Sequence, residues 1–243
     1  MNIPIEISSQ IIHYLTFNEL TDFRATDRES REVVKEYEGH PDEYIVIGSF
    51  ELWSRCFPKV KYLDIGNSGT SSEDFSHFNG VEELTTSVCP IKNDVFQSFA
   101  NLKTLSIYSV FYRDSEYIYD IDRAFLCLSG LTSLELLYSG YITDEAFVPL
   151  TNLKHLKLED CYRITSKAIR GLKNLRTLHI KEQQNIGDEA FEGSPIEELS
   201  IIDNRYITMK GVTRLTNLKT LYCMDVPHVV ETGLPACVRK LIF

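Results

Sequence analysis

The side chains in this chain of 243 residues that are most able to do nucleophilic or metal chemistry are six cysteines and six histidines. The cysteines are scattered and form no C-x-x-C pair, so the sequence predicts neither a redox motif nor a zinc ribbon. His155 and His179 have no third ligand at metal spacing, and no P-loop or glycine-rich phosphate signature occurs. We therefore expect a non-catalytic protein without a metal or a cofactor.

The charge balance points to protein partners. Lysine and arginine total 25 against 35 aspartate and glutamate residues, which gives a net charge of −10 and a pI of about 5.1. This balance argues against nucleic acid or an anionic membrane as the partner. No run approaches the ~18 apolar residues of a transmembrane helix, and the first residues lack the basic and apolar regions of a signal peptide. Because no Asn-x-Ser/Thr acceptor occurs either, we expect a cytoplasmic or nuclear location.

The elements that would position any functional side chain come from an internal repeat. Four segments have the form L-x-x-L-x-L, starting at Leu131, Leu153, Leu175 and Leu218, and weaker copies start at Val60, Val81, Leu102, Ile196 and Val238. Successive starts differ by 21, 21, 29, 22, 22, 21, 22 and 20 residues. Such a period indicates a solenoid in which neighbouring units bury one continuous core, with one strand in each unit.

The second half of each unit recurs as well. Segments that begin at Ile142, Ile164, Ile186 and Ile207 align without gaps and predict a short helix after each strand. Thr143, Thr165 and Thr208 follow three of these isoleucines, where a side-chain oxygen can accept a hydrogen bond from an N–H group of the first helical turn.

This strand and helix unit resembles the cysteine-containing leucine-rich repeat, whose pattern runs L-x-x-L-x-L-x-x-C/N-x-x-I-T. Cys89, Cys161 and Asn204 occupy its C/N position, and Cys223 takes an inward leucine position, so these cysteines are predicted to be core thiols. The resemblance implies an α/β horseshoe over residues 58–243, with parallel strands on the concave face and short helices on the convex face. About nine units of 20–22 residues are expected, with an insertion near 111–119.

Residues 1–40 lack the repeat and predict a small all-α unit, with apolar residues at helical spacing; residues 41–57 form a junction or an irregular first repeat. The opening Ile3-Pro4-x-Glu6-Ile7, followed by Ile11, Tyr14-Leu15 and Glu19-Leu20, resembles the F-box. That resemblance implies docking of a Skp-type adaptor, and through it a cullin, with contacts from Pro4, Ile7, Ile11, Leu15 and Leu20. The alternative is that these helices only cap the open end of the solenoid.

The outward strand positions can be written as two columns that would line the concave face. Glu135 beside Lys157 and Glu159 beside Lys181 are predicted to pair across strands, whereas apolar residues at other outward positions are candidates for target contact. Tyrosines of the insertion and its neighbourhood suit protein recognition too; a self-packed insertion is the alternative. The predicted target-binding residues are Tyr108, Tyr117, Tyr119, Leu137, Ile202, Tyr222 and Met224.

Two functional hypotheses follow. The first is the substrate-recognition subunit of a Skp-cullin-F-box type ubiquitin ligase, in which the F-box binds the adaptor and the repeats hold a target protein. The target would then be modified by a separate enzyme because the two are held close together. The second is a leucine-rich-repeat interaction scaffold with no role in ubiquitin transfer.

Overall fold

A computed structural model describes residues 33–35, 58–64, 80–87, 95–108, 121–230, 233–234, 238 and 240–242. Within these residues the strands form one parallel sheet whose order follows the chain, from β1 to β9. The strands are β1 (Tyr62–Asp64), β2 (Glu83–Ser87), β3 (Thr104–Tyr108), β4 (Ser133–Leu137), β5 (His155–Glu159), β6 (Thr177–Lys181), β7 (Glu198–Ile202), β8 (Thr220–Met224) and β9 (Lys240–Ile242). The predicted parallel solenoid is thereby confirmed.

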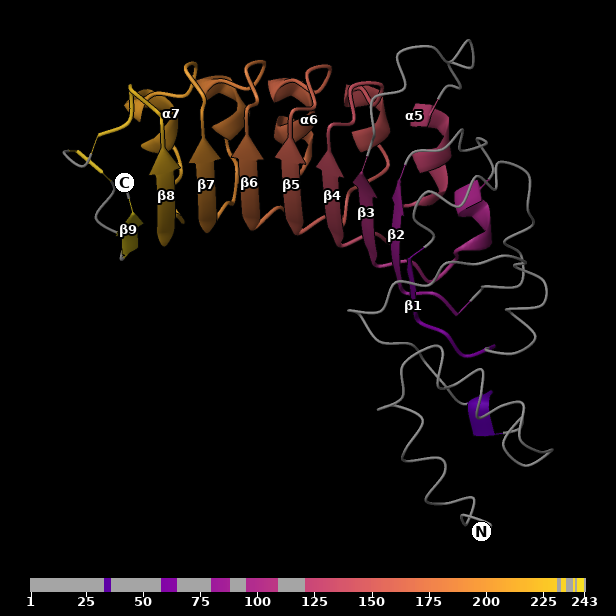
Figure 1. The fold of residues 1–243 in the computed structure, drawn as a ribbon. Helices are drawn as coiled ribbons and strands as arrows, with labels where there is room; N and C mark the ends of the chain where they lie inside the picture. The colour runs from indigo at the N-terminus through magenta and orange to yellow at the C-terminus, as the bar shows by residue number, and fades with distance from the viewer. Residues whose placement is uncertain are drawn as a thin grey trace.

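Short helical segments form the second layer behind the sheet (Figure 1). They are η2 (Val95–Ser98), α5 (Ile121–Ala124), η3 (Phe125–Cys127), η4 (Asp144–Phe147), α6 (Ser166–Gly171), η5 (Asp188–Phe191) and α7 (Met209–Val212). Several are single 3-10 turns, because a unit of about 22 residues leaves little room beyond one strand and two loops. None of the helices in the described part of the chain is long and apolar enough to cross a membrane.

The core lies between the two layers. The L-x-x-L-x-L residues point inward, and Leu134, Leu156 and Leu178 are almost fully buried at the same position of successive strands. Phenylalanines of the helical layer close the other side, and Phe96 and Phe125 pack edge to face with ring centroids 5.8 Å apart. Since each leucine packs on those of the neighbouring units, one hydrophobic cluster runs along the sheet.

The predicted helix caps are confirmed. The hydroxyl oxygens of Thr143, Thr165 and Thr208 each accept a hydrogen bond from the backbone N–H two residues further on. Gly187 takes the same position before η5 and has no side chain that could do so.

A recurring turn continues the hydrogen bonding between strands at their carboxyl ends. The residue after each strand from β4 to β8 has a left-handed backbone: Tyr138, Asp160, Glu182, Asp203 and Asp225 have φ between 46° and 57°. The first four donate their N–H to the carbonyl of the last residue in the next strand, at 2.8–3.1 Å. This turn directs the chain from the sheet toward the helical layer, and we call the edge along which it lies the carboxyl rim.

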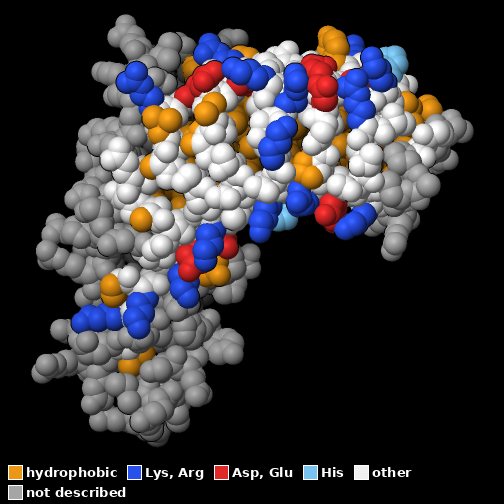
Figure 2. Space-filling view, turned by 180° about the vertical axis from the view of Figure 1, so that it is seen from behind, with side chains coloured by type: hydrophobic (Ala, Val, Ile, Leu, Met, Phe, Trp, Pro, Cys, Tyr) orange, Lys and Arg blue, Asp and Glu red, His pale blue; other side chains and the backbone are white. Residues whose placement is uncertain are grey.

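Charged side chains of both signs alternate over the helical layer (Figure 2). Lys167 pairs with Glu145 at 3.0 Å and Arg170 with Glu192 at 3.1 Å, each pair linking neighbouring units. These exposed pairs contribute little to stability.

Candidate functional site

The outward side chains of the sheet, here called the sheet face, form the two predicted columns. The strand register places each residue beside its counterpart in the next unit, one strand spacing (~4.8 Å) away. The inner column from β3 to β8 is Ser106, Glu135, Lys157, His179, Ser200 and Tyr222, and the outer column is Tyr108, Leu137, Glu159, Lys181, Ile202 and Met224.

The predicted ion pairs across strands are confirmed. Lys157 pairs with Glu135, and Lys181 Nζ lies 2.6 Å from Glu159 Oε1. Tyr138 Oη also donates to Glu159 Oε1 at 2.8 Å. Burial opposes ionisation of this carboxyl, but the hydrogen bonds from Lys181 and Tyr138 outweigh it and hold the pKa of Glu159 below its usual value. Glu159 is therefore a fixed charge in the middle of the sheet face.

This charged pair divides the predicted target-binding residues into two apolar groups. Tyr108 and Leu137 lie side by side on β3 and β4, and we call them the first patch. Ile202 and Met224 lie side by side on β7 and β8, with Tyr222 two residues before Met224 on the same face, and we call these three the second patch. Tyr108 is 37% exposed and Met224 43% exposed, while Leu137, Ile202 and Tyr222 are partly exposed. Tyr117 and Tyr119 lie outside the described residues.

A hollow of about 960 Å³ opens beside the second patch at the carboxyl rim. Ile202 and Met224 line it from the sheet face, Val226 and Pro227 from the loop after β8, and Lys181, Glu182, Asp203, Arg205 and Asp225 supply its charged groups. Cys223 also borders it, but burial raises the pKa of this thiol to about 11. The thiol therefore stays protonated at neutral pH and is no nucleophile.

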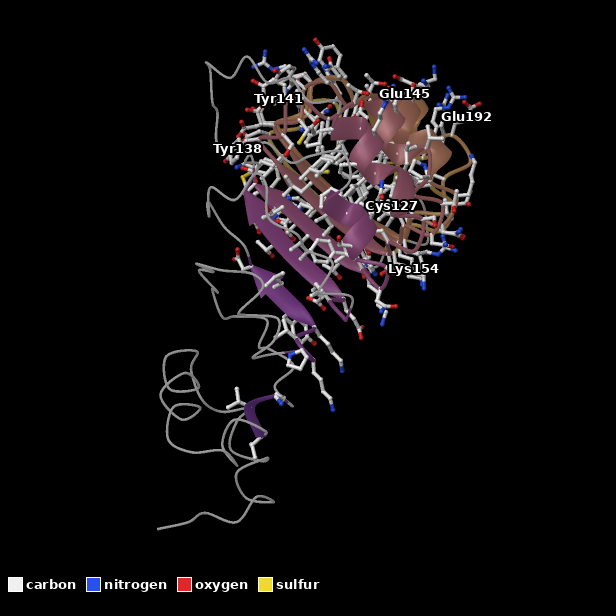
Figure 3. The ribbon with its side chains drawn as sticks, turned by 90° about the vertical axis from the view of Figure 1, so that its right-hand side faces the viewer. Cys127, Tyr138, Tyr141, Glu145, Lys154 and Glu192 are labelled. Atoms are coloured by element: carbon white, nitrogen blue, oxygen red, sulfur yellow. The ribbon has the colours of Figure 1, made fainter. Side chains whose placement is uncertain are left out.

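The carboxyl rim carries exposed tyrosines, and the sequence indicates only some of them as surface residues. Tyr138 and Tyr141 lie on the loop after β4, at the edge where the strands end, whereas Glu145 and Glu192 lie on the helical layer (Figure 3). Tyr162 was not predicted as a surface aromatic. Its ring covers Gly140, since a Cβ on Gly140 would lie only 2.3 Å from Tyr162 Cε1. A glycine opposite a tyrosine one unit later is the signal that could have identified this contact.

The C/N position of the repeat holds the rim loops in place. Cys161 is fully buried, and its Sγ lies 3.4 Å from the Leu136 carbonyl and 3.3 Å from that of Glu159. Asn204 Oδ1 accepts from the N–H groups of Tyr206 and Ile207, both at 2.8 Å. These two residues are the structural groups that the repeat pattern predicts. Burial raises the pKa of Cys161 to about 11, so this thiol too is inert.

No catalytic group emerges from the described residues. Cys127 is an exposed residue on η3 in the helical layer (Figure 3). Its Sγ donates to the Ala124 carbonyl, and partial burial of the thiol raises its pKa. His155 lies beside Thr177 and His179 beside Lys157, so the two imidazoles are not partners in the strand register. No three His, Cys, Asp or Glu side chains of the described part are grouped closely enough to hold a metal. Cys89 lies outside the described residues.

The residues predicted to contact an adaptor cannot be placed. Pro4, Ile7, Ile11, Leu15 and Leu20 all lie outside the described residues. No F-box model matches the chain. Adaptor docking and the unit boundaries at residues 40 and 57 therefore stay predictions.

Two similar solved structures, those of XopL and InlF, share the solenoid fold. The leucine-rich repeat domain of the type III effector XopL is 14% identical and covers 100% of this chain and 96% of its own, with a TM-score of 0.52. The internalin InlF of Listeria monocytogenes is 16% identical, with a TM-score of 0.52. The match covers 90% of this chain and 71% of the InlF chain. TLR13, solved in complex with ssRNA13, is 19% identical with a TM-score of 0.48. The match covers 88% of this chain, but this chain spans only 29% of the TLR13 chain.

The sequence comparison gives the family. A search of the curated proteins finds no matching relative. The family model of the BspA type leucine rich repeat region matches in six copies, over residues 71–197 and 140–225, which together are more than half of the chain. The chain therefore belongs to the BspA-type leucine-rich repeat family.

Proposed function

We propose that this protein is a non-catalytic scaffold that binds a target protein on its sheet face. The observation that carries the proposal is the outer column, where apolar side chains lie on both sides of the Glu159–Lys181 pair. Met224 is 43% exposed at a position that solvent would leave polar. Exposed apolar side chains held on a rigid sheet suit protein recognition, because little conformational entropy is lost when a partner covers them.

We propose further that the target is presented to a ubiquitin ligase. In this hypothesis the chain is the substrate-recognition subunit of a Skp-cullin-F-box type complex in the cytoplasm or nucleus, and Pro4, Ile7, Ile11, Leu15 and Leu20 contact the adaptor. Its support is the spacing of residues 3–20, which resembles the F-box, together with the leucine-rich repeats that follow. The other candidate is a scaffold without a ubiquitin role, favoured by the exposed sheet face alone.

Co-expression with a Skp-type adaptor, followed by size-exclusion chromatography, tests the ligase hypothesis. Wild type should elute with the adaptor as a one-to-one complex, and Ile7→Asp/Leu15→Asp should abolish it, because both residues lie on the predicted apolar face. Ser9→Asp is the control, since residue 9 lies off that face at helical spacing and adds one of the two negative charges that the double substitution adds. If folded wild type never co-elutes, the ligase hypothesis is wrong and the scaffold remains.

A further inference from the structure

The hollow at the carboxyl rim combines an apolar wall with an excess of negative charge. Ile202, Met224 and Pro227 line it together with three carboxylates, those of Glu182, Asp203 and Asp225. Methionine is flexible and polarisable, so an exposed Met224 can adjust to the side chain of a partner. A segment that enters the hollow would therefore meet both apolar surface and carboxylates.

The carboxylates are brought together by the repeat itself. Glu182, Asp203 and Asp225 each follow a strand, in units that are neighbours in the sheet, and all three have the left-handed backbone. The turn therefore sets them in a row along the rim at about one strand spacing. A row of this kind fits an extended segment that runs along the rim, across the ends of β6, β7 and β8.

The cations of the hollow do not balance these carboxylates. Lys181 lies 2.6 Å from Glu159 Oε1 on the sheet face and 3.6 Å from Glu182, so its charge is already shared. Hydrogen bonding to Glu159 raises the pKa of Lys181 and keeps it a cation bound to that carboxylate. Arg205 is the second cation of the lining, and among the described residues no cation lies within 4 Å of the Asp203 or Asp225 carboxylates. A partner that supplies positive charge would complement them.

We propose that the hollow binds an extended segment of the target protein in which an apolar side chain contacts Ile202 and Met224 and a neighbouring lysine or arginine contacts Asp203 and Asp225. This inference rests on the proposed target-binding function and names the chemistry of the partner. A phosphorylated or acidic segment would face three carboxylates and is disfavoured. The segment can bind without rearranging the scaffold at β6 and β7, because the turns at Glu182 and Asp203 are hydrogen bonded to the next strand.

The test is a selection of phage-displayed random 12-residue peptides on the full chain, followed by fluorescence anisotropy with the enriched peptides. Enriched peptides should carry lysine or arginine next to a large apolar residue. Asp203→Asn/Asp225→Asn should weaken their binding by about tenfold or more, because the charge is lost while asparagine still tolerates the left-handed backbone. Met224→Glu should abolish binding, and Glu192→Gln on the helical layer is the control that should leave it unchanged.

Leu137→Glu separates the failure of this inference from the failure of the proposed function. Peptides lost in Leu137→Glu but retained in Met224→Glu would bind at the first patch, which overturns the hollow and leaves target binding on the sheet face intact. Enriched peptides without a basic residue, affinities unaffected by the two asparagine substitutions, or no enrichment at all would each overturn the inference. None of these results bears on adaptor docking, which is read from a separate complex.

Discussion

Replacing Thr165 with valine should expose how neighbouring units are tied together in the helical layer. Thr165 Oγ1 donates to Asp144 Oδ2 of the preceding unit at 2.7 Å, and its N–H donates to Asp144 Oδ1 at 2.8 Å. The same hydroxyl caps α6 by accepting from the N–H of Lys167 at 3.2 Å. This arrangement recurs where Thr143 meets Asp122 and where Thr208 meets Asp188.

The magnitude follows from the two bonds that valine removes. A hydrogen bond to a charged group contributes about 1.5–3 kcal/mol, and an N-cap contributes about 1 kcal/mol. Thr165 is only partly buried, so water replaces some of what is lost. The backbone N–H still binds Asp144 in the variant. We therefore expect Thr165→Val to lower the free energy of unfolding by about 2 kcal/mol.

Urea unfolding followed by circular dichroism measures this change. The midpoint should fall while the m value stays constant, because valine has nearly the shape of threonine. Thr177→Val on β6 is the matched control: within the described residues its hydroxyl makes no hydrogen bond, so the change should stay within about 0.5 kcal/mol. Equal effects of the two substitutions, or a loss below 0.5 kcal/mol in Thr165→Val, would refute the role given to this hydroxyl.

Two further predictions concern the rim and the sheet face. Glu182→Gly should raise the free energy of unfolding by about 0.5–1 kcal/mol in urea unfolding, because glycine adopts φ 57° without a steric cost. Glu198→Gly at the start of β7, where the backbone is extended, should lower it. A loss of stability in both variants would show that the left-handed turn is not strained. Burial, and then the charge of Lys157, lower the pKa of His179, so the unfolded state binds the proton more tightly and stability should fall as pH drops through about 6.5. His179→Gln should flatten this loss between pH 7.5 and 5.5, and an unchanged pH dependence would exclude His179 as its source.

The features that could be predicted from sequence are those that every unit repeats. The leucines at 131, 134 and 136 recur at 153, 156 and 158, and one inward pattern sufficed to place the strands and their register. The same periodicity predicts Glu159 beside Lys181, and the strand register confirms it. The cap positions were predictable as well, because a small polar residue that recurs at the start of a helix is typical of an N-cap.

The carboxyl rim could not be predicted, since its conformation has no residue signature. A left-handed backbone is usually indicated by glycine, yet here it falls on Tyr138 and Glu182 as well as on three aspartates. The hydrogen bond from each of the first four turns to the next strand selects this conformation, and that is a property of the stacked units rather than of one segment. The hollow depends on these turns, so the sequence identified Ile202 and Met224 without the carboxylates beside them.

Stability and recognition depend on different positions of the same unit. The binding specificity could therefore be changed without loss of the fold. Inward leucines, cap threonines and the C/N residues each make contacts with a neighbouring unit, so a substitution there weakens the stack. Met224 ends β8 and Asp225 follows it; both are exposed, and the strand is held by the buried Leu221 and Cys223. Outward residues at β7 and β8 can therefore be exchanged with little loss of stability, and a swap of their apolar and acidic side chains for basic ones should redirect binding toward acidic segments while the fold persists.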